Sequence, residues 1–366
     1  MQKVKVNYLE LAGTSYEIGK QLALKTDAQE MYRKAPKYFS EEAMEEALEV
    51  YKKCCPGILE ELRGFSDVSG ISVKDMAYTW MTYLVPRCSG VAISGEHMTD
   101  GHTRLLRNYE FGIGEEDMTL CRTCVEGKYS HVGGMITRFG RTEGINDQGL
   151  AVSMSSCGIP VSNIPQMRAP EVKGLQFWAV IRVLLENCKN VEEALELLKN
   201  IPVAFNINLY LADCGGNVAL YETINGHEAF KLEKPGRNSY LFGTNHIVLK
   251  ALQQYEPYAM NNSIIRYQNI QKFMEATDVK QESELLRFAL TKYPEGLTCY
   301  YYGAYFGTIK TVVLDTVEKR YTLCWMGQEK NGLEHYYVSD KMREESKYVE
   351  YEEEEPITDL FEMRPL

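Results

Sequence analysis

The residue best suited to covalent chemistry is Cys88, because charged side chains follow it at a spacing that a β-hairpin would bring together. Cys88 opens the segment CSGVAIS, which alternates small and apolar residues as a half-buried strand does. A turn-rich stretch at 95–101 leads into HTRLLRNYE at 102–110, the second strand of the hairpin. Arg107 and Glu110 would then lie beside Cys88, with Glu110 positioning Arg107. A nearby cation lowers the pKa of a thiol, and the thiolate is the nucleophile, so the pattern predicts a nucleophilic cysteine.

Several segments of the chain carry a family resemblance. Cys88 together with RNYE at 107–110 resembles the N-terminal-nucleophile (Ntn) amidohydrolases, in particular the penicillin acyltransferase family and the related choloylglycine and penicillin V hydrolases. Four more segments are similar to family elements and occur in the same order: LAGTSYEIG at 11–19, EGINDQGLA at 143–151, GTNH at 243–246 and NSIIRY at 262–267. The resemblance covers about residues 8 to 327.

The resemblance implies a mechanism in which Cys88 becomes an N-terminal residue. Autoproteolysis between Arg87 and Cys88 would free an α-amino group, whose unperturbed pKa of about 7.7–8.0 suits it to take the thiol proton. The resemblance also implies that Asn245 donates a hydrogen bond to the oxyanion, and that a backbone N–H near Ser156 completes the oxyanion hole. Arg87 stands where the fungal penicillin acyltransferase has Gly, so the alternative that the chain is not cleaved stays open.

Each candidate site residue has a structural alternative. Arg107 and Glu110 could form only a cross-strand ion pair, and family members carry Asp at the position of Glu110. Asn146 is a candidate for the substrate or oxyanion site, although capping a turn is the better interpretation. Arg266 is a site candidate on a predicted helix and could equally be a surface residue. His246 is expected to be structural, because an Ntn site already has its base.

Composition and charge exclude several classes of protein. The 366 residues are 45% hydrophobic and 25% charged, as in a globular protein, and the net charge of −11 argues against a nucleic-acid surface. No apolar run is long enough for a membrane span. Ten cysteines are too dilute for a disulfide scaffold, and the opening MQKVKV lacks a signal peptide, which predicts a cytoplasmic protein. Cys121 and Cys124 form a single C-x-x-C pair, so we expect no metal site and no cofactor.

The order of predicted elements indicates an α+β fold. Residues 1–87 are expected to be a helical presegment and possible propeptide, with helices at 41–53 and 74–84. Residues 88–340 would form the catalytic domain, and the resemblance implies a four-layer αββα sandwich of antiparallel sheets. Its expected strands are 89–94, 102–109, 132–139, 150–155, 206–213, 217–223, 227–232, 239–243, 307–314 and 319–326. Its expected helices are 174–188, 191–200, 261–275 and 281–290. Residues 341–366 would be a solvated acidic tail.

These observations favour an amidase that cleaves a linear carbon–nitrogen amide through a cysteine thioester. Two alternatives stay open: an acyltransferase that passes the acyl group to an amine, and a catalytically silent Ntn scaffold that binds a ligand. The expected partner is a small-molecule N-acyl amide. We expect no nucleic acid and no membrane partner, and a homo-oligomer is left open.

Overall fold

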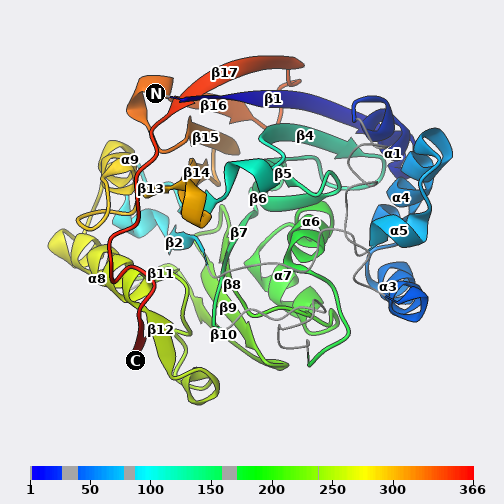
Figure 1. Cartoon of the computed structure of the whole chain (residues 1–366). Coiled ribbons are helices and arrows are strands. Elements are labelled where there is room, and N and C mark those ends of the chain that lie inside the picture. Colours follow the sequence, from blue (N-terminus) through cyan, green and yellow to red (C-terminus); the bar gives the residue numbers. More distant parts are fainter. Residues whose placement is uncertain (1, 27–39, 78–86, 159–170, 238) are drawn as a thin grey trace.

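The computed structural model describes residues 2–26, 40–77, 87–158, 171–237 and 239–366. In this part of the chain two large sheets lie face to face, and helices cover their outer faces (Figure 1). This is the four-layer αββα arrangement of an α+β protein, as predicted. The later part of the expected helix 74–84 lies outside the described residues, and its start is helix α5 (Val73–Ala77).

The larger sheet has nine strands among the described residues. Neighbouring strands are antiparallel except β1 and β4, which are parallel. Their order across the sheet is β10 (His227–Glu233), β9 (Val218–Ile224), β8 (Ile207–Ala212), β7 (Ala151–Ser156), β6 (Gly140–Asn146), β5 (His131–Ile136), β4 (Thr119–Val125), β1 (Gln2–Gly13) and β17 (Glu345–Tyr351).

The smaller sheet contains the predicted hairpin. Strands β2 and β3 pair antiparallel, with Ser89 opposite Asn108 and Gly90 opposite Arg107, so the hairpin prediction is confirmed. The order of this sheet is β11 (Tyr240–Gly243), β2 (Ser89–Ile93), β3 (Arg104–Phe111), β14 (Phe306–Asp315), β15 (Arg320–Trp325) and β16 (Glu334–Tyr337), and the short β13 (Tyr300–Tyr301) pairs with β14. A separate two-stranded sheet joins β12 (Tyr258–Met260) to β18 (Met363–Pro365).

Both faces of the inner strands of each large sheet are buried, and strand alternation assigns each side chain to a layer. In β8, Tyr210 and Ala212 face the core between the sheets, whereas Leu209 and Leu211 face the helices. The helices on the nine-stranded sheet are α1 (Ser15–Leu24), α3 (Glu41–Cys54), α4 (Pro56–Ser69), α6 (Phe177–Asn187) and α7 (Val191–Leu198). The smaller sheet is covered by α8 (Asn261–Ala276) and α9 (Glu282–Leu290).

One expectation about the chain ends is incomplete and one is wrong. The described part of residues 1–87 is mainly helical, as expected, but it also contains β1, which lies between β4 and β17 in the nine-stranded sheet. The acidic C-terminal segment is not a solvated tail: β17 pairs with β1, and Val349 and Tyr351 are buried. Strands β1 and β17 therefore both belong to the sandwich and lie beside each other at one edge of the nine-stranded sheet, whereas the C-terminus itself lies near β12 (Figure 1).

Candidate active site

Cys88 lies immediately before β2, with only 2% of its surface exposed. Its Sγ is 3.4 Å from Nη2 of Arg107 and 4.0 Å from the carbonyl oxygen of Glu110. Its φ of +86° lies in the left-handed region, which costs a residue with a side chain about 1–3 kcal/mol. The strain therefore falls on the residue that follows the peptide bond expected to be cleaved.

The environment of the Cys88 thiol contains opposing effects. Burial raises the pKa of the thiol above its ordinary value, and the guanidinium of Arg107 offsets only part of this increase. In the uncleaved chain the thiol therefore holds its proton at neutral pH and must lose it before it can attack a carbonyl.

Arg107 is anchored to the opposite sheet. Its Nη1 lies 2.5 Å from Oε2 of Glu143 on β6. Glu143 also accepts a hydrogen bond from the Tyr321 hydroxyl at 2.7 Å and lies 3.2 Å from Nζ of Lys310. Burial alone would raise the pKa of Glu143, but Lys310 and Arg107 outweigh it and lower the pKa to about 2. Glu143 is therefore the carboxylate that positions Arg107 beside the sulfur.

Glu110 does not pair with Arg107, and strand alternation explains why. The two residues are three positions apart on β3, so their side chains point to opposite faces of the sheet. Glu110 faces α8, where its Oε2 lies 3.6 Å from Nη1 of Arg266 and its Oε1 accepts from the Thr308 hydroxyl at 3.1 Å. Burial raises the pKa of Glu110, and Arg266 partly offsets this. The expectation that Glu110 positions Arg107 is wrong, because Glu110 supports Arg266 instead.

Arg266 is fully buried and connects several groups around Cys88. Its Nη1 donates to the carbonyl oxygen of Cys88 at 3.0 Å, and its Nη2 donates to Oδ1 of Asn245 at 2.6 Å and to Oδ1 of Asn262 at 2.9 Å. The alternative of a surface arginine is therefore wrong. Because Arg266 donates to Oδ1 of Asn245, the amide nitrogen of Asn245 must face the other way.

The amide nitrogen of Asn245 points at the peptide bond before the nucleophile. Nδ2 donates to the carbonyl oxygen of Arg87 and, at 2.7 Å, to that of Ser156. The Ser156 hydroxyl in turn accepts from the backbone N–H of Arg87 at 3.0 Å. The Arg87 residue that precedes Cys88 is thus held at its carbonyl by Asn245 and at its N–H by Ser156.

Asn146 lies outside this group and organises a turn. Its Oδ1 accepts from the backbone N–H groups of Gln148 and Leu150, and its Nδ2 donates to the carbonyls of Leu185 and Cys188 at the end of α6. A role for Asn146 in the substrate or oxyanion site is therefore wrong, and the turn interpretation is confirmed.

His246 is placed as a structural residue. Its Nδ1 lies 2.8 Å from the Ser263 hydroxyl, which also accepts from the backbone N–H of Asn245 at 2.8 Å. Burial lowers the pKa of His246 to about 4, so the ring is neutral at pH 7. His246 and Ser263 together orient the loop that carries Asn245.

Sequence reasoning missed Glu143, Lys310, Asn262 and Ser263. Glu143 had a usable signal, because it lies two residues before the apolar Ile145 on one strand and so faces the same core. A carboxylate at such a position requires a buried cation. Asn262 and Ser263 were within a family-like segment, but their contacts depend on long-range packing.

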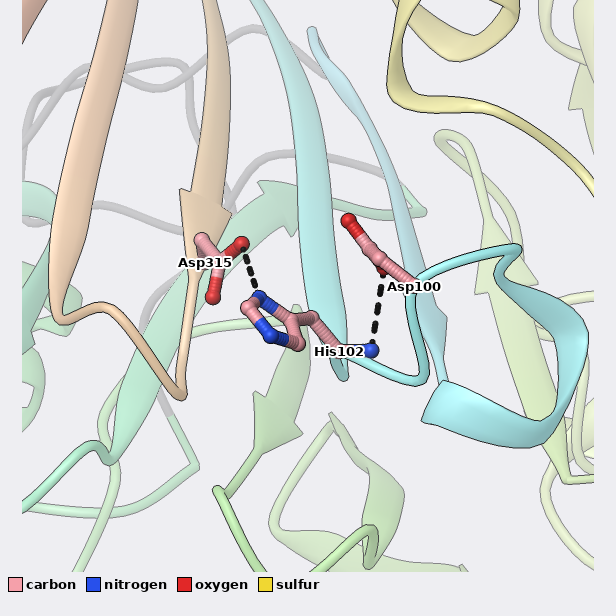
Figure 2. Close-up of side chains that lie close together, drawn as sticks. All are labelled: Asp100, His102 and Asp315. Atoms are coloured by element: carbon pink, nitrogen blue, oxygen red, sulfur yellow. Dashed lines mark hydrogen bonds and ion pairs between the residues drawn. The ribbon is translucent and has the colours of Figure 1, made fainter.

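A group of residues away from Cys88 has side chains of the types that bind metal ions. In the described part of the chain, Asp100, His102 and Asp315 offer ligand atoms that lie within 4.8 Å of one another (Figure 2). However, Nη2 of Arg104 lies 2.6 Å from Oδ2 of Asp100 and 2.9 Å from Oδ2 of Asp315. The guanidinium already occupies the position between the carboxylates, so we treat this group as a charge-compensated ion-pair cluster.

The single C-x-x-C pair lies on β4. Cys121 and Cys124 are three residues apart on this strand, so their side chains point to opposite faces.

No helix of the described residues is both long and apolar enough to cross a membrane.

The αββα layers, with a cysteine immediately before the inner strand β2 and an amide donor at the preceding carbonyl, define the class of amide-cleaving and acyl-transferring Ntn enzymes. The chain belongs to the acyl-coenzyme A:6-aminopenicillanic acid acyl-transferase family, whose model matches residues 97–330, more than half of the chain. The match begins after Cys88.

Solved structures that match this chain include three from bacteria. A mutant of conjugated bile acid hydrolase from Clostridium perfringens is 15% identical, with 74% of this chain and 99% of that chain covered and a TM-score of 0.44. Penicillin V acylase from Agrobacterium tumefaciens is 18% identical, with 67% and 77% covered and a TM-score of 0.38. Penicillin G acylase from Alcaligenes faecalis is 13% identical, with 55% and 51% covered and a TM-score of 0.40. No curated protein sequence matches significantly.

Proposed function

We propose that the protein is an amidase that cleaves linear carbon–nitrogen amides through a thioester on Cys88, after self-cleavage of the Arg87–Cys88 bond. One observation carries this proposal: the Asn245 amide donates to the Arg87 carbonyl, which belongs to the peptide bond next to the Cys88 thiol. A donor at that oxygen stabilises the negative charge that develops when a nucleophile adds to the carbonyl.

Self-cleavage would be the first reaction of this site. The Cys88 sulfur, having lost its proton, adds to the Arg87 carbonyl carbon, and the oxyanion is held by Asn245. The carbon–nitrogen bond then breaks, the nitrogen is protonated to become the α-amine of Cys88, and Arg87 is left as a thioester. Water hydrolyses the thioester, which releases the Arg87 carboxylate and restores the thiol.

Turnover of a substrate amide repeats these steps with a new base. The freed α-amine of Cys88 takes the thiol proton, and the thiolate adds to the substrate carbonyl. Asn245 again stabilises the oxyanion, while Arg266 holds Asn245 and Glu143 holds Arg107 beside the sulfur. The substrate amine leaves with a proton, and water completes the hydrolysis.

Acyl transfer is a second candidate, because the family is named for transfer from acyl-coenzyme A. The two reactions share the thioester and differ in the group that attacks it. If transfer is the main reaction, an added amine acceptor will consume the thioester faster than water and give an N-acyl product.

A panel of N-acyl amides, with the acyl-enzyme trapped at low pH for mass analysis, tests the proposal. Wild-type protein should release amine and show one acyl adduct on Cys88, whereas Cys88→Ala should be inactive. Cys188→Ala is a matched control, because Cys188 is equally buried but packs in the helical layer. Equal activity in Cys88→Ala would overturn the proposal, and a fully inert protein with an unreactive Cys88 would favour a binding scaffold.

A further inference from the structure

The side chain of Arg87 occupies a built cation site directly beside the reactive carbonyl. Nε donates to the Tyr305 carbonyl at 2.6 Å, and Nη2 donates to the Ala304 carbonyl at 3.1 Å. The guanidinium carbon lies 4.8 Å from the Phe306 ring centre and 5.1 Å from that of Phe361. Only 5% of Arg87 is exposed.

The local structure prepares this site for a planar cation. Tyr305 has a left-handed φ of +56°, and the two consecutive carbonyls at 304 and 305 accept from one guanidinium. The rings of Phe306 and Phe361 lie 5.7 Å apart at 88°, so they form two walls of a corner. Aromatic faces attract cations, and a guanidinium stacks on them more readily than an ammonium does.

The C-terminal segment holds one of these walls in place. Leu360 is fully buried against Phe306, and its carbonyl accepts from Nδ2 of Asn262 at 2.6 Å. The backbone N–H of Asn261 donates to the Glu362 carbonyl at 2.8 Å. Phe361 lies between these two anchored residues, so its position is set by the fold.

Arg87 contributes the acyl half of the peptide bond that Cys88 faces. The proposed self-cleavage turns Arg87 into the free C-terminus of the associated 87-residue piece, and this end must leave the corner before a substrate can bind. The acyl group of that substrate must then place its carbonyl at Asn245 and its side chain where the Arg87 side chain was. We infer that this corner is the acyl-side specificity subsite and that it selects a guanidinium. This inference rests on the proposed function, and its substrates are amides and short peptides whose acyl component ends in arginine or a similar guanidino acid.

A neutral acyl group would lose the attraction to the two rings, which is the effect that citrulline tests. A neutral acyl group without N–H donors would in addition leave the carbonyls of Ala304 and Tyr305 without their donors. A site built to hydrogen-bond a substrate discriminates strongly against an analogue that lacks the matching groups.

The test compares Nα-acetyl-arginine and Nα-acetyl-citrulline amides of aminomethylcoumarin, using the full chain after processing. Citrulline has the shape of arginine without its charge. The kcat/KM for the arginine substrate should exceed that for citrulline by about 10- to 100-fold. Phe361→Leu should reduce this ratio, whereas Phe230→Leu, a half-exposed phenylalanine on β10, should retain it.

The rate of self-cleavage gives a second readout that needs no added substrate. Arg87→Met removes the charge and the N–H donors while keeping an unbranched stem, and should slow self-cleavage by about tenfold or more; Arg87→Lys keeps the charge and should slow it less. Equal rates for the arginine and citrulline substrates, or unchanged cleavage in Arg87→Met, would overturn the subsite while leaving the amidase intact. A wild-type chain that neither self-cleaves nor hydrolyses any amide would instead refute the proposed function.

Discussion

At the scale of single residues, Asn245 is the group whose chemical role is most specific. It donates to the carbonyl before Cys88, and its orientation is set by Arg266. Asn245→Ala should lower kcat by about 10²–10³-fold with little change in substrate affinity, because the donor acts mainly in the transition state. Steady-state kinetics check this. Asn146→Ala is the control, since it should lower stability but not kcat, and a loss of affinity alone in Asn245→Ala would assign Asn245 to substrate binding.

Arg107 and Glu110 should shift the pKa of the Cys88 thiol in opposite directions. Arg107 lowers that pKa and Glu110 raises it, because one is a cation and the other an anion near the sulfur. Arg107→Ala should therefore raise the thiol pKa, and Glu110→Gln should lower it. Alkylation of Cys88 measured against pH gives both values. A raised pKa in Glu110→Gln would mean that Glu110 positions Arg107 after all.

Self-cleavage should depend on pH differently from amide hydrolysis. Burial raises the pKa of the Cys88 thiol in the uncleaved chain, so the reactive thiolate is scarce at pH 7. The cleavage rate should increase as the pH rises through and beyond the ordinary thiol value of about 8.5. After cleavage the α-amine takes the proton, so hydrolysis should reach its plateau at a lower pH. Rate profiles of both reactions check this, and coincident profiles would contradict it.

The candidate site was predictable only in part. Cys88, Arg107, Asn245 and Arg266 are close together in the structure, and each lies in a segment with family resemblance. The pairing of charges was assigned wrongly, because proximity along the chain favoured Glu110 over Glu143. Strand alternation between positions 107 and 110 argues against that pairing, whereas the contact of Arg107 with β6 requires the packing of two sheets.

At the scale of elements, the C-terminal segment supports the site from outside. Asn262 connects the Leu360 carbonyl to Arg266, and Arg266 connects to Asn245. Deleting residues 356–366 should therefore slow self-cleavage by about 10²-fold, because small displacements of a catalytic donor are costly. Time courses of cleavage and a thermal melt check this. Deleting only 364–366 keeps these contacts and should have little effect, and full-rate cleavage in the longer deletion would contradict the argument.

Many strands of the two sheets were predicted, but β4 and β6 inside the nine-stranded sheet, and β1 and β17 at one edge of it, were not. Strands β2, β3, β7, β8 and β9 have apolar, β-branched or aromatic runs bounded by turn residues, which is a local signal. In strand β1, Val4, Val6 and Tyr8 alternate with polar residues, but the rest of the N-terminal segment has a helical pattern. The partners of β1 are β4 and β17, which are far away in the sequence. The many charges of β17 suit an edge strand but equally suit a solvated tail.

At the scale of the whole molecule, the described residues before Cys88 are part of the αββα sandwich. Strand β1 lies between β4 and β17, and α1 and α4 pack in the same core as α6. The two products of self-cleavage should therefore stay associated, because separating them would break pairing on both sides of β1 and expose this core. Self-cleavage would then break the Arg87–Cys88 bond without releasing the presegment.

The most direct test of the account is the intact mass and N-terminal sequence of purified wild-type and Cys88→Ala protein. Wild-type protein should consist of pieces of 87 and 279 residues (366 − 87 = 279) that co-elute, the larger beginning at Cys88. Cys88→Ala should remain one chain of 366 residues. A wild-type protein that stays intact while it hydrolyses amides in a Cys88-dependent manner would contradict the account, because the thiol proton would then have to go to a base other than the α-amine of Cys88.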